Sequence, residues 1–122
     1  MQTFRDLKVW QQAHQLVLEV YRVTSEFPTE ERYGLMTQMR RAGISIAANI
    51  TEGHRRRSKI DFLHFLNMAH GSLDELAYYC ILAPDLGYVT HLRVRRCAAM
   101  AEEVGRMLTG LQSHVKSEVH HV

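Results

Sequence analysis

The sequence predicts an all-α protein that folds as an antiparallel up-down-up-down four-helix bundle, with a single domain over residues 1–122. Apolar residues recur every three to four positions along four segments, which is the spacing of one helix face. Short loops with helix-starting and helix-ending residues separate these segments, and short loops favour antiparallel neighbours. A chain of 122 residues with 46% apolar residues is also large enough for one buried core.

The first helix is predicted from about Arg5 to Glu26. Thr3 and Asp6 resemble a capping box at its start, and Pro28 ends it. Its buried seam is predicted to consist of Val9, Ala13, Leu16, Val20, Val23 and Phe27.

The second helix is predicted from Thr29 or Glu30 to Glu52, with Thr29 as its N-cap and Gly53 as its stop. Glu30 and Glu31 would face the positive end of the helix dipole. The predicted seam is Leu35, Met39, Ala42, Ile46 and Ile50.

The third helix starts with Ser58 as its N-cap and ends at Pro84 and Gly87. Its seam is predicted to be Phe62, Leu66, Ala69, Leu73, Leu76, Cys80 and Ala83.

The fourth helix begins after Thr90 and has Cys97, Met100, Val104, Met107 and Leu111 as its predicted seam. The tail from about residue 115 shows no apolar pattern and is predicted to fray.

The composition indicates a cytoplasmic protein with no membrane partner. No apolar run approaches the ~20 residues of a membrane span, and the first ten residues lack the apolar block of a signal peptide. Cys80 and Cys97 fall on apolar helix positions, which favours reduced thiols that pack in the core over a disulfide or a metal site.

The first helix carries a second apolar stripe beside its seam. Wide core faces with scattered surface residues are one explanation. A subunit interface is the other, because contiguous exposed apolar surface usually marks a contact. We favour the interface, and its predicted residues are Trp10, Val17, Tyr21, Ile44 and Ala48.

A row of polar residues follows the second helix. It consists of Gln38, Arg41, Ser45, Asn49 and Glu52, which fall within an arc of about 80°. A solvated face is one interpretation. The mixture of donors and acceptors favours a row that is at least partly buried and structural, with Arg41 paired to Glu75 or Glu52.

No pattern indicates an enzyme, a cofactor or a metal centre. The glycines are scattered, so there is no phosphate-binding glycine loop, and HExxH and paired CxxC motifs are lacking. A di-iron bundle needs Glu-x-x-His on two helices, whereas Asp61 with His64 is a single near match. Ser45 has no histidine at helical spacing that could activate it.

The formal net charge is only +2, so the distribution of charge decides what it implies. In the predicted topology the start of the first helix, the second loop and the end of the fourth helix share one end of the bundle. We call this the basic end, and its predicted nucleic-acid-binding residues are Arg5, Lys8, Arg55, Arg56, Arg57 and Lys59. A solvated loop is the alternative. The nearby N-terminus of the third helix favours anions, and binding would be to phosphate, with little sequence preference.

Several segments resemble a known family: "FRDLKVWQQAHQLVLEVY", "FPTEERYGLMTQMRRAGISIAANITEG", "DFLHFLNMAHGSLDEL" and "LGY". They are similar to the four-helix-bundle proteins encoded in intervening sequences of bacterial 23S rRNA genes. The accessory variability proteins of diversity-generating retroelements share this fold. The resemblance implies a homopentamer, a basic surface for nucleic acid and, in the retroelement branch, a reverse-transcriptase partner. The family has no established catalytic residues, so none is assigned here.

The function expected from the sequence is that of a non-enzymatic oligomeric protein, which binds RNA or DNA non-specifically through its basic end. It could serve as an accessory to a partner that processes RNA or DNA. The alternative is a protein-binding scaffold or adaptor that has no nucleic-acid role and whose basic end docks an acidic partner.

Overall fold

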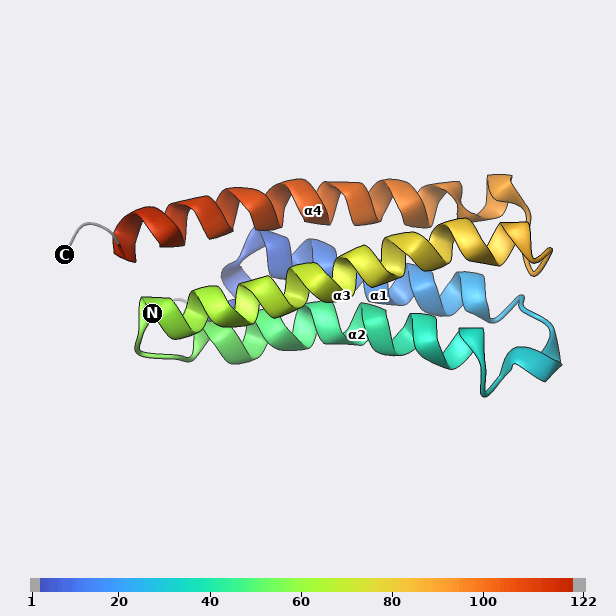
Figure 1. Ribbon diagram of the computed structural model, residues 1–122, viewed down its shortest axis with the longest axis horizontal. Helices are drawn as coiled ribbons and strands as arrows, with labels where there is room; N and C mark the ends of the chain where they lie inside the picture. The colour runs from blue at the N-terminus through green and yellow to red at the C-terminus, as the bar shows by residue number, and fades with distance from the viewer. Residues whose placement is uncertain (1–2, 120–122) are drawn as a thin grey trace.

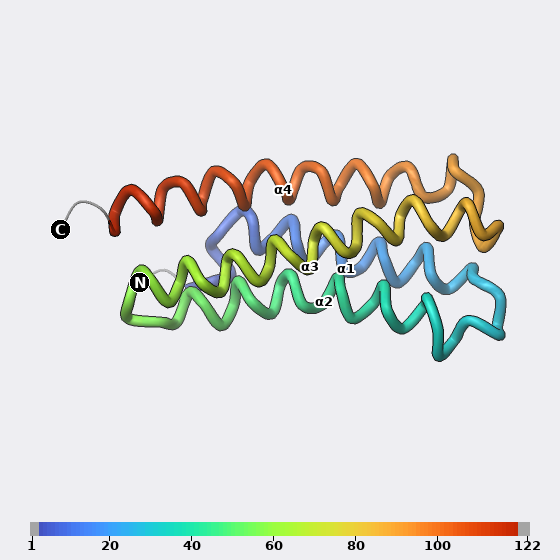
Figure 2. Tube along the Cα trace, viewed as in Figure 1, coloured from blue at the N-terminus to red at the C-terminus, as the bar shows by residue number. Residues whose placement is uncertain are grey.

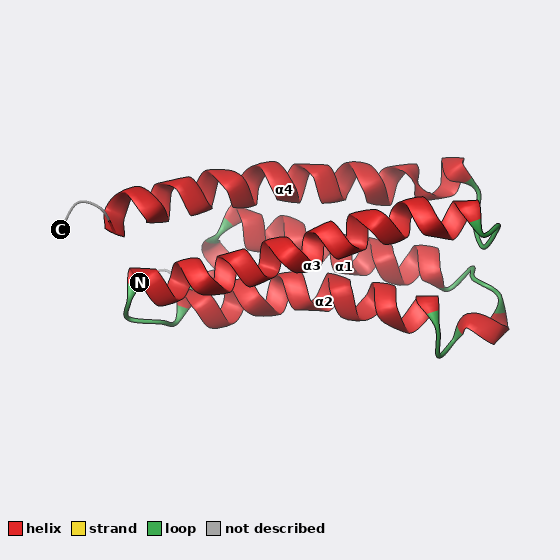
Figure 3. Cartoon of the chain, in the orientation of Figure 1, coloured by secondary structure: helices red, strands yellow, loops and turns green. Residues whose placement is uncertain are grey.

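The chain forms a bundle of four long helices that run alternately in opposite directions, which confirms the predicted fold class (Figure 1). The computed structural model describes residues 3–119, and this part of the chain contains no strand (Figure 3). Two short 3-10 helices cover Phe4–Asp6 and Thr29–Glu31. The long helices are α1 (Lys8–Thr24), α2 (Leu35–His54), α3 (Lys59–Asp85) and α4 (His91–Val119).

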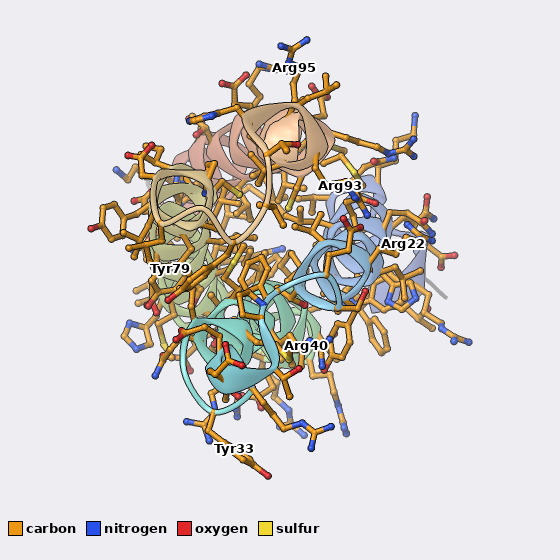
Figure 4. The ribbon with its side chains drawn as sticks, turned by 90° about the vertical axis from the view of Figure 1, so that its right-hand side faces the viewer. Arg22, Tyr33, Arg40, Tyr79, Arg93 and Arg95 are labelled. Carbon is orange, nitrogen blue, oxygen red and sulfur yellow. The ribbon has the colours of Figure 1, made fainter. Side chains whose placement is uncertain are left out.

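Each long helix packs against two neighbours. α1 and α3 both contact α2 and α4, so the four helices form a square when the bundle is viewed along its axis (Figure 4). The trace in Figure 2 places the turn between α2 and α3 at the same end of the bundle as the start of α1 and the end of α4. The other two connections lie at the opposite end.

The predicted seams of α1 and α2 are buried throughout, and that of α3 is buried from Leu66 onward. The seam of α4 differs from the prediction. Ala101 and Leu108 are buried, whereas Met100, Met107 and Leu111 are half-buried. The buried set of α4 is Val94, Cys97, Ala101, Val104, Leu108 and Val115, whose spacing of three, four, three, four and seven keeps one face toward the core.

The first two helices are shorter than predicted. Thr3 and Asp6 form a capping box, but it starts the 3-10 helix, and α1 begins only at Lys8. The residues from Thr29 also form a 3-10 turn, so α2 begins at Leu35. α2 begins later than predicted because Glu31, and not Thr29, caps it. A carboxylate oxygen of Glu31 accepts the Leu35 backbone N–H at 3.1 Å.

The predicted ends around α3 and α4 are confirmed. Ser58 accepts the backbone N–H of Asp61 at 3.3 Å, and Thr90 accepts that of Arg93 at 3.0 Å. Gly87 has φ +79°, and the N–H groups of Gly87 and Tyr88 bond back to the carbonyls of the last turn of α3. This is a Schellman ending, in which glycine adopts the left-handed conformation without steric cost.

The prediction of a frayed tail from about residue 115 is wrong for the described part of the chain. α4 continues to Val119, and Val115 is only 2% exposed. Val115 lies seven residues after Leu108 and therefore on the same face of α4. Its burial shows that this part of α4 still packs against the bundle. His120 and His121, which were also assigned to the tail, lie outside the described residues.

None of the helices between residues 3 and 119 is both long and apolar enough to span a lipid bilayer.

α2 approaches α3 closely at Gly53, one residue before the end of α2. A Cβ atom added there would lie 2.7 Å from the Cβ of Phe65 and 3.0 Å from the ring of Phe62. The Cβ of Phe65 is attached directly to the backbone of α3 and cannot rotate away. Gly53 therefore serves as more than a helix stop, because its lack of a side chain allows the two helices to meet beside the basic end.

We expect Gly53→Ala to destabilise the protein, although alanine is the better helix former. The gain in helix propensity is about 1 kcal/mol, and forcing an extra methyl group into a packed contact costs about 1–3 kcal/mol. Gly71→Ala is the matched control, because Gly71 is exposed in the middle of α3 and nothing lies within 4 Å of an added Cβ. Thermal unfolding should show a lower Tm for Gly53→Ala and a higher Tm for Gly71→Ala. A rise in both would show that α2 and α3 separate easily at Gly53.

Candidate functional site

The structure places all of the predicted nucleic-acid-binding residues at the basic end. The arginine triplet forms the turn between α2 and α3, with Lys59 as the first residue of α3. The other two cations precede or begin α1. All are exposed: Arg5, Lys8, Arg55, Arg56, Arg57 and Lys59. Because the turn is exposed, its three adjacent guanidinium groups stay hydrated.

A recess of about 350 Å³ lies within this end. Its apolar lining comes from Leu7, Phe62 and Leu111, which belong to the start of α1, to α3 and to α4. Its polar lining consists of His54, Arg56, Arg57, Lys59, His114 and Glu118. One recess therefore brings together the segments that the predicted topology assigned to a common end.

The charges of the recess are only partly neutralised. Lys59 lies 3.7 Å from a carboxylate oxygen of Glu118, and His114 lies 3.4 Å from the same oxygen. The guanidinium carbon of Arg56 lies 4.7 Å from the centre of the Phe65 ring, so a cation–π contact orients it. Between residues 3 and 119, Arg55 and Arg57 form no ion pair. Their charge is therefore available to a ligand.

The polar row of α2 is only partly what the sequence suggested. Ser45 and Asn49 are half-buried between α2 and α3, where the hydroxyls of Ser45 and Ser72 lie 2.8 Å apart. The Asn49 amide donates to the Ser45 carbonyl at 2.8 Å and to its hydroxyl at 3.0 Å. The Ser45–Ser72 hydrogen bond therefore joins the two helices, and Asn49 supports Ser45 from within α2.

The predicted pairing of Arg41 is wrong for the single chain. Arg41 is exposed, as are Gln38 and Glu52, and no ion pair of Arg41 occurs in the described chain. Glu75, also exposed, instead accepts the Tyr79 hydroxyl at 2.7 Å. The row lies at the rim of the contact between α2 and α3, so only its middle is covered.

The arginine that α2 does engage is Arg40, which faces α1. Its Nε donates to the Thr24 hydroxyl at 2.9 Å, and its guanidinium lies 4.3 Å from the centre of the Tyr21 ring (Figure 4). Because α2 packs between α1 and α3, both flanks of its seam are covered. Arg40 lies on the flank that meets α1, about 100° around the helix from Arg41.

The predicted interface residues divide into two groups. Trp10 and Val17 are half-buried, and the Trp10 indole N–H donates to the Thr51 hydroxyl at 2.9 Å. They are therefore used largely within the chain, between α1 and α2. Tyr21 is 40% exposed, Ile44 is 44% exposed and Ala48 is exposed, so these three stay available on the outer surface.

Sequence reasoning missed one buried charge at the opposite end. Glu19 is 3% exposed, and its carboxylate pairs with Arg93 of α4 at 3.2 Å and with Arg22 at 3.3 Å. Arg93 also binds Glu26, and Figure 4 shows Arg93 and Arg22 close together, with Arg95 directed outward. The sequence contained a signal for this burial, because Glu19 lies three residues after Leu16 and four before Val23, on the apolar seam of the first helix.

The potential metal ligands of the described chain are not clustered. Within residues 3–119 no three histidine, cysteine or carboxylate side chains gather around a common point. Asp61 and His64, the single near match to a di-iron motif, are both exposed at the start of α3.

The structure thus defines a class: an all-helical, antiparallel four-helix bundle with a cationic recess at one end. The sequence model of the family described as 23S rRNA-intervening sequence protein matches residues 5–110, and the chain belongs to this family. No curated protein sequence matches the chain.

A solved structure supports the same fold. It is the crystal structure of a protein with unknown function from the S23 ribosomal protein family of Bacteroides thetaiotaomicron VPI-5482. The two chains superimpose with a TM-score of 0.80 over 86% of this chain and 95% of the other, at 23% sequence identity. At that identity the similarity concerns the fold alone.

We expect Arg93→Ala to destabilise the protein by about 1–3 kcal/mol, because it leaves the buried Glu19 carboxylate with less counter-charge. The cost is below that of a fully orphaned buried charge, since Arg22 still reaches Glu19. Arg41→Ala is the control with the same change in composition, and it should cost no more than about 0.5 kcal/mol. Urea unfolding of both variants measures the difference. Equal losses of stability would mean that Arg41 is buried in the assembled protein or that the Glu19 contact is solvated.

Proposed function

We propose that this is a non-enzymatic, oligomeric, cytoplasmic protein that binds RNA or DNA without sequence preference through its basic end. The observation that carries the proposal is the convergence of Arg56, Arg57 and Lys59 on one recess, with Arg55 exposed beside them. Phosphate contacts by lysine and arginine supply most of the affinity of non-specific binding. We expect the contacts to be to the phosphate backbone of the nucleic acid, because the ring of Phe65 already carries Arg56 on its face and is not free to stack on a base.

Two features of the basic end favour a phosphate ligand over simple hydration. The triplet directly precedes α3, whose N-terminal N–H groups and dipole attract anions. The apolar contact of α2 with α3 at Gly53 also holds the turn in place, so that its charges stay close together. A cyclic assembly would multiply this density, because each copy adds another basic end around the axis.

We propose a closed homo-oligomer, with a pentamer as the expected form. The support is the family resemblance together with exposed apolar side chains on α1 and α2, namely Leu18, Tyr21 and Ile44. An RNA- or DNA-processing enzyme, such as a reverse transcriptase, would be the class of protein partner that such a ring could assist.

Nucleic-acid binding is tested with random-sequence RNA and duplex DNA across a salt titration. Each phosphate neutralised should contribute roughly −0.9 to the slope of log K against log salt for duplex DNA. Binding should therefore weaken steeply between about 50 and 200 mM salt. Replacing Arg55, Arg56 and Arg57 together by alanine should flatten this slope without changing the helix content.

The matched control is the triple variant Arg32→Ala, Arg95→Ala and Arg96→Ala, which removes the same charge from exposed residues at the opposite end. It should bind almost as well as the parent protein. Equal weakening by both variants would refute a localised site. If the parent protein does not bind at low salt, the scaffold function that docks an acidic partner replaces this proposal.

Oligomerisation is tested by light scattering, with an expected mass of about five times the 14.1 kDa of one chain. Ile44→Glu should reduce this mass, because it introduces a charge into the proposed contact, which is costly to bury. Ile81→Glu on α3 is the control, since Ile81 is 62% exposed and lies outside the proposed contact. A monomeric mass for the parent protein at micromolar concentration would refute the ring.

A further inference from the structure

The two cysteines of the chain face each other between α3 and α4. Cys80 and Cys97 are 17 positions apart in the sequence, yet their sulfur atoms lie 3.9 Å apart. Both are free thiols, 5% and 0% exposed. Core packing accounts for two buried thiols, but it does not require them to be in contact with each other.

A cavity of about 360 Å³ opens to solvent beside this pair. Its apolar lining includes Ala77 and Ile81 of α3 and Ala98 and Ala101 of α4, and Cys80 is among the lining residues. Cys97 is not, so it lies behind Cys80 as seen from the cavity. A small reagent that enters would meet the sulfur of Cys80 first.

The rim of the cavity restricts which reagents enter. Asp74 and Glu102 line it from the two helices, and both are exposed. Two carboxylates repel anions, whereas a small neutral molecule can reach the apolar interior. The volume is several times that of a water molecule, which occupies about 30 Å³ in the liquid.

The contact between the thiols makes them chemically unequal. The pKa of Cys80 is lowered because the Cys97 thiol donates a hydrogen bond to its thiolate, and burial opposes this effect. The pKa of Cys97 is raised by the same contact and by burial. The thiolate is the nucleophilic form of cysteine, and a hydrogen bond from the second thiol stabilises it. The cavity reaches the pair at Cys80, so Cys80 is the sulfur that meets the reagent.

We propose that Cys80 and Cys97 form a peroxide-sensitive dithiol that closes a disulfide between α3 and α4. The Cys80 thiolate attacks one oxygen of a neutral hydroperoxide, the O–O bond breaks, and the leaving oxygen takes up a proton. Cys80 becomes a sulfenic acid. The sulfur of Cys97 then attacks the sulfur of Cys80, the S–O bond breaks, and water leaves with the proton of Cys97. Two thiols and one hydroperoxide give one disulfide, one alcohol and one water. With hydrogen peroxide, the alcohol is a second water.

The fold provides room for this step. The sulfur atoms must approach from 3.9 Å to about 2.05 Å, and the cavity beside Cys80 allows the side chain to rotate. Pro84 lies four residues after Cys80 and has no N–H, so it cannot donate the usual helical hydrogen bond to the Cys80 carbonyl. The last turns of α3 can therefore bend more easily than a regular helix.

The experiment exposes the folded protein to hydrogen peroxide and measures its intact mass, with glutathione in a parallel tube as a reactivity standard. We expect a mass loss of about 2 Da, reversed by dithiothreitol, and no disulfide-linked dimer on a non-reducing gel. Peptide mapping should find Cys80 oxidised in Cys97→Ala, as a sulfenic acid or its further oxidation products, whereas Cys97 should stay a thiol in Cys80→Ala. Circular dichroism confirms that both variants fold.

A second pair of variants tests entry through the cavity in the protein with both thiols present. Ala77→Leu narrows the cavity and should slow disulfide formation several-fold, while Ala99→Leu, on α4 and not among the lining residues, should not. The proposal is overturned if both thiols survive a dose that fully oxidises the glutathione. It is also overturned if Cys97 is oxidised in Cys80→Ala while Cys80 survives in Cys97→Ala, or if Ala99→Leu slows the reaction as much as Ala77→Leu.

Discussion

The contact of Gly53 with Phe65 is the constraint on which the basic end depends. It brings α2 so close to α3 that the chain must reverse within a few residues. Ser58 then caps α3, and the residues between the two helices stay exposed. Arginines tolerate this position because they remain hydrated there. The ring of Phe65 also carries the guanidinium of Arg56, so one aromatic residue both closes the helix pair and orients a charge.

The opposite end of the bundle uses charge differently. Glu19 is buried and is held between Arg93 and Arg22, so its charges are satisfied internally and are not offered to a ligand. A buried ion pair adds little net stability over an apolar pair, but removing one partner is costly. The Glu19–Arg93 contact therefore penalises arrangements in which α4 is shifted along α1. Apolar seams supply most of the stability, and the polar contacts favour one alignment of the helices.

The fold and the location of the basic end could be predicted from the sequence. The spacing of apolar residues every three to four positions and helix caps such as Ser58 depend on nearby residues alone. It failed where a neighbouring helix decides the outcome. Arg40 and Arg41 are adjacent, and only the packing of α1 against α2 determines which one is covered. The start of α2 depends on the Glu31 side chain, which lies four residues before Leu35 and outside the usual N-cap position, and the end of α4 depends on the isolated Val115. The orientation of the cations at the basic end also depends on tertiary contacts, since Phe65 of α3 holds the guanidinium of Arg56.

An even number of antiparallel helices brings the start of α1 and the end of α4 to the same end of the bundle as the turn between α2 and α3 (Figure 1). The arrangement determines where a fusion partner would lie. A tag or fluorescent domain fused at either terminus would stand beside the cationic recess, where it could block a ligand or contribute charge of its own. The turn around Gly87 lies at the far end and is exposed, so an insertion there would leave the recess open.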